Sequence, residues 1–317
     1  MTFRKIAIRS ALVVIGLPVA LVLLTVVGFY AVMSSFATNR TNGTIVVEGQ
    51  PRQYLLHVPR SYDRARPTPL VISLHAAALW PATQMELSQW NTVADEHGFI
   101  VVYPSGTGLT GGSSVLPFRV WLLRPEAVLS ANVRFISALI DTLAAGYNID
   151  PTRIYVNGYS NGGAMAFAQS CRMSDRIAAV GTVSAAQDEP FRSCADSRPM
   201  PFINLHGTAD LVPYEGGTSW LSPRPFPSVP GWTADWARRN RCGPNPVASV
   251  VAPDVTRLEY VNCADDAAVV LFTVRGGGHA WPGGKPLPAW MVGPTTHTVS
   301  ATNQMWAFFR DHPRRAR

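Results

Sequence analysis

The sequence predicts an α/β fold in which a mostly parallel central sheet carries helices on both faces. The first observation is a series of short, continuously apolar runs, which are typical of buried parallel strands. The second is that segments with helical periodicity lie between these runs, and such alternation favours crossover connections between parallel strands. The third is length: 317 residues, 47% of them hydrophobic, can bury the core of one domain of roughly 250 residues.

The individual strands and helices follow from local patterns. Two alternating segments, 44–48 and 52–57, flank Gly49-Gln50-Pro51 and predict an edge hairpin. Apolar runs predict strands at 69–75, 98–103, 154–156, 177–184, 201–206, 256–260 and 268–274. Helical periodicity predicts helices at 84–97, 128–147, 232–239 and 300–311, and a further helix that starts at 164. Four prolines between 222 and 231 predict an irregular loop.

The positive net charge is confined to the two ends of the chain. Of the formal charge of +7, residues 1–40 carry +4 and residues 310–317 carry +3, which leaves residues 41–309 neutral. A nucleic-acid-binding domain concentrates Lys and Arg on its folded surface. The sequence therefore argues against nucleic acid as a partner.

A run of 22 uncharged residues, 11–32, predicts an N-terminal membrane-spanning or signal helix. As a helix it would be about 33 Å long, enough to cross a bilayer. Arg4, Lys5 and Arg9 precede it, so the N-terminus should stay in the cytoplasm while the rest is exported. An uncleaved anchor is preferred, because a cleavable signal has a shorter apolar core. Ser35-Phe36-Ala37 nevertheless resembles a cleavage site, so a secreted form remains open.

These features divide the chain into four expected parts. Residues 1–37 form the signal anchor or signal peptide, residues 38–43 a polar linker, residues 44–311 the α/β domain and residues 312–317 a basic tail. The tail is interpreted as a solvated end, with contact to anionic lipid headgroups as an alternative. The expected location of the domain is extracytoplasmic, with the membrane as a partner only through the N-terminal segment.

The four cysteines agree with export. Cys171, Cys194, Cys242 and Cys263 contain no C-x-x-C pair and have no histidine at metal-binding spacing, so no metal site is expected. The spacings of 23 and 21 residues suggest two sequential local disulfides, which form in oxidising compartments. Four free buried thiols are the alternative.

The pentapeptide Gly158-Tyr159-Ser160-Asn161-Gly162 fits the G-x-S-x-G pattern of a nucleophile placed between a strand and a helix. Such a turn needs residues without bulk two positions before and after the serine, and glycine supplies this room. The turn would expose the Ser160 hydroxyl and direct the Asn161 backbone N–H towards the same point. A loop rich in glycine and serine, without chemistry, is the alternative, but the flanking strand and helix favour the nucleophile.

A serine nucleophile needs a histidine base and a carboxylate that orients it. His279 is the preferred base because it follows the strand at 268–274 through three glycines. Asp210 is the preferred acid because it comes just after the strand at 201–206, at the carboxyl end where catalytic groups of parallel sheets gather. Asp265 and Asp266 are the alternatives, but they precede their strand and so belong to the opposite end of the sheet.

In combination, several motifs of this chain resemble the polyhydroxybutyrate depolymerase-like esterases and the related feruloyl and acetylxylan esterases, which have the α/β-hydrolase fold. The resemblance covers roughly residues 44–311 and rests on Arg52-x-Tyr54-x-x-x-Val58-Pro59, Pro69-Leu-Val-Ile-Ser-Leu-His75, Gly98-Phe-Ile-Val-Val-Tyr-Pro104, Gly158-Tyr-Ser-Asn-Gly-Gly-Ala-Met165, His206-Gly-Thr-Ala-Asp210 and Gly276-Gly-Gly-His-Ala-Trp-Pro-Gly283. It implies a triad of Ser160, Asp210 and His279. It also implies the disulfide pairs Cys171–Cys194 and Cys242–Cys263.

Two segments depart from the family pattern. The family has His-Gly after the third strand, where a backbone N–H completes the oxyanion hole, whereas this chain has His75-Ala76-Ala77-Ala78. A backbone donor does not depend on the side chain, so Ala77 is expected to serve with Asn161. If the family's glycine uses a positive φ, Ala76 would strain the turn. In addition, the helix entry around Asn132 lacks the usual acidic pair.

The sequence thus predicts an exported serine esterase that hydrolyses carboxylic esters through an acyl-enzyme, without a metal or organic cofactor. Its substrate is expected to be a hydroxyalkanoate, a feruloyl or aryl ester, or an acetylated polysaccharide. Trp281 and Trp290 are candidates for substrate binding, although tryptophans more often pack in cores. A serine peptidase on the same fold is the first alternative, and a non-catalytic surface binding protein that retains the fold is the second.

Overall fold

The computed structural model describes residues 40–108, 118–186, 194 and 198–315, together with 23–24 and 27–28. The chain separates into two units, Met1–Thr38 and Asn39–Arg317. Apart from residues 23–24 and 27–28, which are helical, the expected membrane-spanning or signal helix lies outside the described residues.

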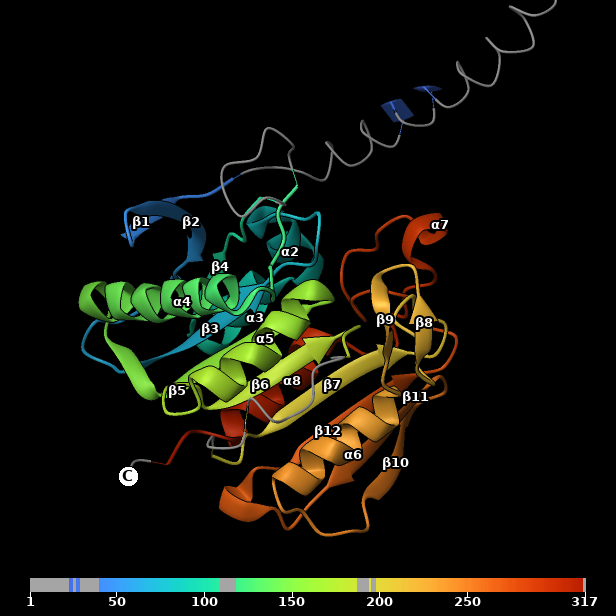
Figure 1. Ribbon diagram of the computed structural model, residues 1–317. Coiled ribbons are helices and arrows are strands. Elements are labelled where there is room, and N and C mark those ends of the chain that lie inside the picture. Colours follow the sequence, from blue (N-terminus) through green and yellow to red (C-terminus); the bar gives the residue numbers. More distant parts are fainter. Residues whose placement is uncertain are drawn as a thin grey trace, which may run out of the picture. The chain divides into compact units, whose positions relative to one another are not determined.

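One sheet of ten strands organises the second unit (Figure 1). In spatial order the strands are β1 (Gly43–Val47), β2 (Gln50–His57), β4 (Ile100–Pro104), β3 (Thr68–Leu74), β5 (Ile149–Tyr159), β6 (Ala179–Val183), β7 (Phe202–Gly207), β12 (Val269–Val274), β11 (Val255–Tyr260) and β10 (Val247–Ala252). The six strands from β4 to β12 pair in parallel, as the continuous apolar runs predict. Two antiparallel strands extend the sheet at each edge.

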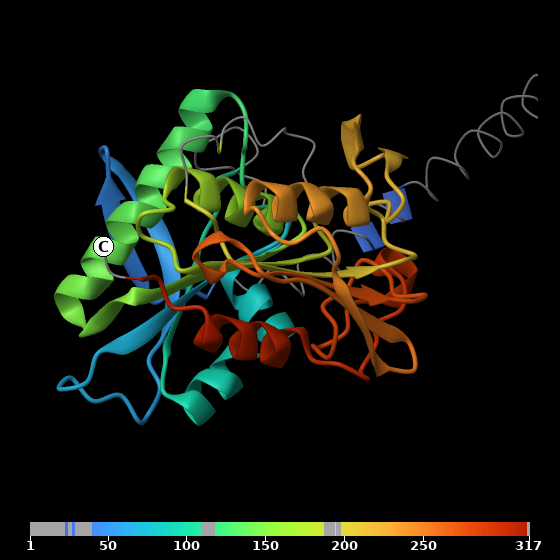
Figure 2. The ribbon, with the colours of Figure 1, turned by 90° about the horizontal axis from the view of Figure 1, so that it is seen from below.

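Helices cover both faces of the sheet (Figure 2). On one face lie α4 (Glu126–Gly146), α5 (Asn161–Arg172) and α6 (Val229–Arg239); on the other lie α2 (Pro81–Ser88), α3 (Trp90–His97) and α8 (Ala301–Asp311). Each face has its own hydrophobic layer. On β5, for example, Ile154 and Val156 enter the first layer and Tyr155 and Tyr159 the second.

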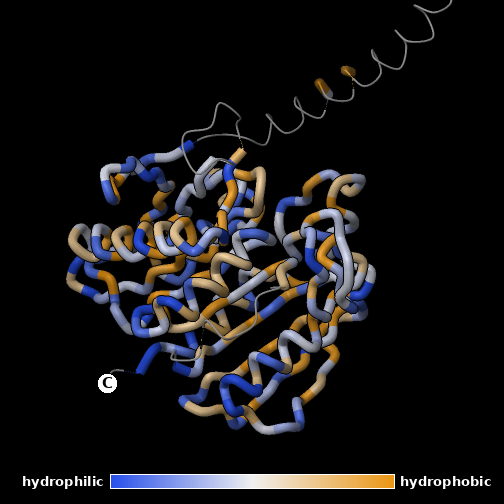
Figure 3. The backbone as a smooth tube through the Cα atoms, viewed as in Figure 1, coloured by the Kyte–Doolittle hydropathy of each residue, from blue (hydrophilic) through white to orange (hydrophobic). Residues whose placement is uncertain are grey.

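The burial of both faces explains the apolar strands. Side chains alternate between the two layers along each strand, so the central strands have no solvated side. Figure 3 shows hydrophobic segments along these strands and hydrophilic segments in the surrounding loops. Among the described residues, α4 is the one helix whose length and hydropathy would allow it to cross a membrane. Because its Phe135, Ile136 and Leu139 are fully buried against the sheet, it is a core helix of this unit.

Three local predictions were wrong. The expected helix 84–97 is two helices, because Gln89 adopts a left-handed φ of 56° and its N–H closes the end of α2 on the Met85 carbonyl. The expected irregular loop 222–231 contains β9 (Ser222–Phe226), which forms a separate hairpin with β8 (Gly217–Ser219), and the first turn of α6. Strand β10 was missed because five of its six residues are exposed, so it has neither an apolar run nor a buried alternating face.

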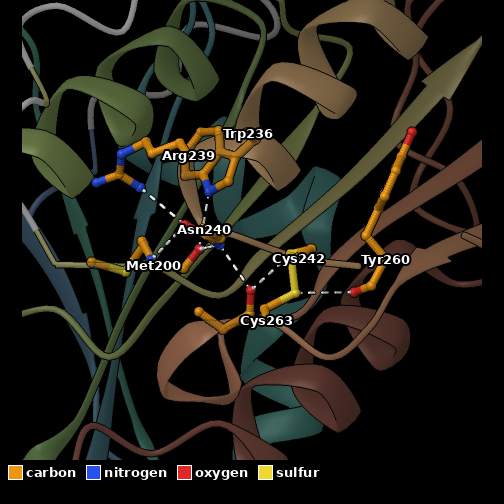
Figure 4. The surroundings of a disulfide bond; sticks show 8 residues. Met200, Trp236, Arg239, Asn240, Cys242, Tyr260 and Cys263 are labelled. Atoms are coloured by element: carbon orange, nitrogen blue, oxygen red, sulfur yellow. Dashed lines mark hydrogen bonds between the residues drawn. A yellow bond between two sulfur atoms is a disulfide. The ribbon is translucent and has the colours of Figure 1, made fainter. Parts of the chain in front are cut away.

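The structure contains the two expected disulfides, Cys171–Cys194 and Cys242–Cys263. Beside the second lies Asn240, whose side chain is fully buried at the end of α6 (Figure 4). Its Nδ2 donates to the carbonyls of Met200 and Ala267 at 2.7 and 2.8 Å, and its Oδ1 accepts from Met200 N at 3.0 Å. This amide therefore joins α6 to the segments that enter β7 and β12.

Candidate active site

Ser160 occupies the tight turn between β5 and α5. Its backbone has φ 53° and ψ −117°, a conformation that L-residues rarely adopt and that stores roughly 1–3 kcal/mol of strain. The Ser160 N–H donates to the Val183 carbonyl of β6 at 2.9 Å, which ties the turn to the sheet. A strained serine between a strand and a helix is the geometry that the G-x-S-x-G pattern predicts.

The two glycines of the pattern allow close approach of the backbone. A Cβ on Gly158 would lie 2.1 Å from the Gly162 carbonyl oxygen, and a Cβ on Gly162 would lie 2.3 Å from that of Leu74. Neither glycine has a positive φ; the strain falls on Ser160 itself. Glycine is therefore needed at positions 158 and 162 because a Cβ atom would clash with the neighbouring backbone, and not because the backbone angles exclude other residues.

His279 and Asp210 form a short polar contact between two segments distant in the sequence. His279 Nδ1 lies 2.6 Å from Asp210 Oδ1, and the Asp210 side chain is fully buried. Asp210 follows β7 and His279 follows β12, and these two strands pair in parallel. With Nδ1–H directed at the carboxylate, Nε2 remains as the basic nitrogen of the His279 ring.

The surroundings of Asp210 favour its ionised form. Burial alone would raise its pKa, but His279, as a charge and as a hydrogen-bond donor, outweighs burial together with smaller contributions from His206 and Ser184, and the pKa of Asp210 lies below its usual value. The Val212 N–H donates to the same oxygen, Oδ1, at 2.7 Å. The carboxylate is thus fixed both in position and in charge.

The alternative acids lie elsewhere. Asp265 and Asp266 belong to a short helical turn, η2 (Ala264–Asp266), which precedes β12, and Asp266 forms an ion pair with Arg315. The carboxyl end of β12, which leads to His279, is a full strand of six residues away. The sheet geometry therefore brings Asp210, and neither of the other two carboxylates, to the histidine.

The loop after β3 supplies a backbone donor beside the nucleophile turn. Ala77 is exposed, and within the described residues its N–H has no hydrogen-bond partner. The left-handed conformation falls on Ala78, with φ 63°, and not on Ala76, so the alanine that replaces the family's glycine is unstrained. As the first residue of α5, Asn161 also has an N–H without an intrahelical acceptor.

His75 supports this loop from below as a buried, neutral side chain. Its Nε2 accepts from Gly106 N at 2.9 Å, so Nδ1 carries the proton and donates to the Ala76 carbonyl at 2.8 Å. Burial lowers the pKa of His75 to about 4. His75 is therefore a structural residue of this loop.

Comparison with known proteins gives the family. The sequence pattern of the family described as Esterase PHB depolymerase matches residues 53–194. A protein of Nocardia uniformis subsp. tsuyamanensis, NocK, which its name assigns to the esterases, is 30% identical over 82% of this chain and 79% of its own length. The chain belongs to this esterase family.

More distant relatives agree in class and fold. Feruloyl esterase B of Piromyces equi is 30% identical over 74% of this chain, which spans 44% of that protein. An acetyl xylan esterase from Aspergillus awamori superposes over 84% of this chain and 98% of its own, with a TM-score of 0.57 and 16% identity. The protein is a carboxylic ester hydrolase with an α/β-hydrolase fold.

Two features of this esterase's site were not expected from the sequence. Tyr159, the residue before the serine, is buried, and its hydroxyl donates to the His279 backbone carbonyl at 2.5 Å. The Asn161 side chain pairs with the peptide of Trp121: Oδ1 accepts from Trp121 N at 2.7 Å and Nδ2 donates to Trp121 O at 2.9 Å. Both depend on contacts between segments distant in sequence.

A second histidine, His206, lies close to Asp210. His206 Nε2 donates to the Val212 carbonyl at 2.9 Å and lies 3.6 Å from Asp210 Oδ2. Burial lowers the pKa of His206, with Asp210 opposing the shift. His206 therefore contacts the carboxylate as a neutral ring. No sequence pattern indicated this contact.

The tryptophans near His279 separate into one core residue and one surface residue. Trp281 is buried, and its indole donates to Thr302 Oγ1 at 3.0 Å, so it packs in the core and has no face open to a substrate. Trp290 is 70% exposed on the short helix α7 (Ala289–Val292), next to Val292, whose carbonyl accepts from His279 N. A third, Trp220 in the β8–β9 turn, is 81% exposed and was missed by sequence reasoning.

The described residues contain no group of three or more His, Cys, Asp or Glu side chains that could hold a metal ion. The residues that follow the carboxyl ends of β5, β7 and β12 include Ser160, Asp210 and His279. Their hydroxyl, carboxylate and imidazole are the groups that serine hydrolases use for acyl transfer.

Proposed function

We propose that this protein is an exported serine esterase whose nucleophile, base and acid are Ser160, His279 and Asp210. The observation that carries the proposal is the 2.6 Å contact between His279 Nδ1 and buried Asp210 Oδ1, at the end of the sheet where the strained Ser160 lies. A carboxylate on Nδ1 fixes the tautomer in which Nε2 can accept a proton.

The reaction then proceeds in two halves. In the first, the Ser160 hydroxyl oxygen attacks the ester carbonyl carbon while its proton passes to His279 Nε2. The tetrahedral intermediate collapses, the carbon–oxygen bond to the alcohol breaks, and His279 returns the proton to the departing alkoxide. In the second, water attacks the acyl-enzyme with His279 again as base, and the carboxylic acid leaves.

The negative oxygen of each intermediate is assigned to the backbone N–H groups of Asn161 and Ala77. Both donors lack a partner within the described residues, and Asn161 begins a helix whose dipole favours negative charge there. Removing one such donor from a serine hydrolase costs about 10²–10³-fold in turnover. The two hydrogen bonds between the Asn161 side chain and the Trp121 backbone would restrict the movement of the Asn161 N–H group.

The proposed substrates carry an aromatic or sugar group beside the ester. Trp290 on α7 and Trp220 in the β8–β9 turn are both largely exposed, and Ser219 Oγ donates to the Leu211 carbonyl, which joins the β8–β9 turn to the Asp210 loop. Exposed indoles stack on aromatic rings and sugar faces. Feruloyl esterase B is among the relatives, in line with this substrate class.

The test is hydrolysis of a short-chain aryl ester by the wild type and by Ser160→Ala. The expected result is steady turnover with a burst of released phenol in the wild type and loss of both in the variant. A matched aryl amide tests the peptidase alternative: equal cleavage of amide and ester would favour it. Absence of turnover in the wild type would instead favour the binding protein.

We further propose that residues 1–37 anchor residues 44–311 outside the cytoplasmic membrane, with 38–43 as linker and 312–317 as a basic tail. The uncharged run 11–32 with its basic prefix supports an anchor, and the two disulfides support an oxidising location. A cleaved signal peptide, which would release the esterase, is the alternative.

A further inference from the structure

A cavity of about 500 Å³ lies between β2, the start of α4 and the segments 105–107 and 119. Its lining includes two arginines, Arg52 and Arg119, and one carboxylate, Glu48. Glu48 is occupied elsewhere, since Arg134 contacts it at 2.7 Å at the protein surface. In the described part of the chain, neither Arg52 nor Arg119 forms an ion pair, so the cavity carries two uncompensated positive charges.

The hydrogen bonding of the two guanidinium groups is incomplete. Arg52 donates to Asn132 Oδ1 at 3.0 Å and to the Ser105 carbonyl at 3.5 Å, and it lies over the Phe135 ring, but both acceptors are neutral. Arg119 lies over the Trp80 ring, 4.6 Å from its centroid, and its Nε is buried without a hydrogen-bond partner among the described residues. A buried N–H without an acceptor, such as Arg119 Nε–H, is costly, and a bound acceptor would remove this cost.

A second group without a partner lines the same cavity. The Thr107 hydroxyl is buried and has no partner within the described residues. Burial, followed by the charge of Arg119, lowers the pKa of Arg52 to about 10, and burial lowers that of Arg119. These shifts agree with two cations that share a partly dry space. A planar or tetrahedral oxyanion would supply acceptors to both arginines and to the hydroxyl at once.

This cavity adjoins the esterase site. Arg119 O accepts from Ala78 N at 2.8 Å, one residue from the Ala77 donor, and Trp121, two residues further, is paired with Asn161. Gly106, between Ser105 and Thr107 of the lining, donates to His75 Nε2 below the same loop. An anion bound in this cavity would therefore lie close to the loop that carries the proposed oxyanion donor Ala77.

We propose that this cavity binds a small oxyanion, a carboxylate or a phosphate, between the guanidinium groups of Arg52 and Arg119, with the Thr107 hydroxyl as a further donor. The anion has two possible sources. It is either a free carboxylate carried by the ester substrate, a role that rests on the proposed esterase function, or a separate inorganic or metabolite anion.

Binding is tested directly, without reference to turnover. Inorganic phosphate is titrated calorimetrically into the full chain at constant ionic strength against chloride, with Arg119→Gln and Thr107→Val as variants. Arg310→Gln, an exposed arginine paired with Asp311 on α8, is the matched control. We expect saturable binding that weakens at least about tenfold in Arg119→Gln, measurably in Thr107→Val and not in the control.

The source of the anion is tested with two substrates, the 4-nitrophenyl monoester of glutaric acid and its neutral methyl ester. A preference of the wild type for the acid, reduced in Arg119→Gln and competed by phosphate, assigns the cavity to the substrate's carboxylate. Phosphate binding without such a preference assigns it to a separate anion. The proposal is overturned if phosphate does not bind saturably, or if it binds equally to the wild type and to folded Arg119→Gln.

Discussion

The Tyr159 hydroxyl donates a 2.5 Å hydrogen bond to the backbone carbonyl of His279, which joins the residue before the proposed nucleophile to the proposed base. The His279 N–H in turn donates to Val292 O at 2.6 Å, so the peptide groups on both sides of the base are held. Burial raises the pKa of Tyr159, which keeps it a neutral donor. The position of the imidazole thus depends on a phenol that takes no part in proton transfer.

Removing that hydroxyl should affect turnover more than substrate binding. In Tyr159→Phe we expect kcat for an aryl ester to fall about tenfold with little change in KM, because small displacements of a catalytic group are costly. Tyr155→Phe is the matched control, since Tyr155 lies on the same strand and layer and its buried hydroxyl has no partner among the described residues. Equal kinetics in both variants would contradict the positioning role.

The identity of the acid gives a second prediction. Asp210→Asn should lower kcat by up to about 10⁴-fold, because the amide no longer selects the Nδ1–H tautomer of His279. Asp265→Asn and Asp266→Asn should remain within a few-fold of the wild type. Circular dichroism would verify folding in each case. Near-full activity in Asp210→Asn, with collapse in either of the others, would show that the acid is misassigned.

The disulfides should contribute to stability and not to the reaction. Each closes a loop of 21 or 23 residues, for which chain entropy corresponds to about 3 kcal/mol of unfolding free energy. Replacing one pair with serines should lower Tm by roughly 6–12 °C, with kcat unchanged below the transition. Non-reducing peptide mapping should recover Cys171 with Cys194 and Cys242 with Cys263; crossed pairs would contradict this arrangement.

Acid should destabilise the fold through buried histidine. The pKa of His75 is about 4 in the folded state, against an ordinary value of 6.5, so between these values the unfolded chain binds more protons and stability falls as pH falls. Urea unfolding from pH 7 to 4.5 should show this loss, up to about 1.4 kcal/mol per pH unit. The slope of the unfolding free energy against pH should decrease in His75→Asn. It should persist in His297→Asn, a control at an exposed histidine. A slope independent of His75 would refute the assignment.

Anchoring is tested on the full-length chain in a bacterial host. The uncharged run 11–32 should bring the protein down with membranes and resist washing with high salt, because insertion is hydrophobic and not electrostatic. Recovery of only soluble protein that begins near Thr38 would show that the segment is a cleaved signal.

The parallel sheet and its polar end were predictable because each rests on local signals. Continuous apolar runs located six parallel strands. Ser160, Asp210 and His279 each follow one of these strands, which predicted that all three lie at the carboxyl end of the sheet. The 2.6 Å contact between His279 and Asp210 lies at that end. The spacing of cysteines was local enough to suggest the bridges.

Contacts between distant segments were not predictable in this way. No sequence pattern places the Tyr159 hydroxyl on a carbonyl 120 residues away or the Asn161 amide on Trp121. Trp281 next to His279 invited a role in substrate binding, yet its burial depends on α8, which supplies Thr302. Strand β10 left no signal because edge pairing, and not a buried face, forms it.

The Cys171–Cys194 bridge has a consequence for proteolysis. Ser160 and the two proposed backbone donors lie before the bridged interval, and Asp210 and His279 lie after it. A protease that cuts between residues 172 and 193 would divide the proposed nucleophile from the proposed base in the polypeptide, yet the two fragments would remain one covalent molecule. In an oxidising environment such a nicked chain keeps every reacting group, whereas a reductant would let them separate.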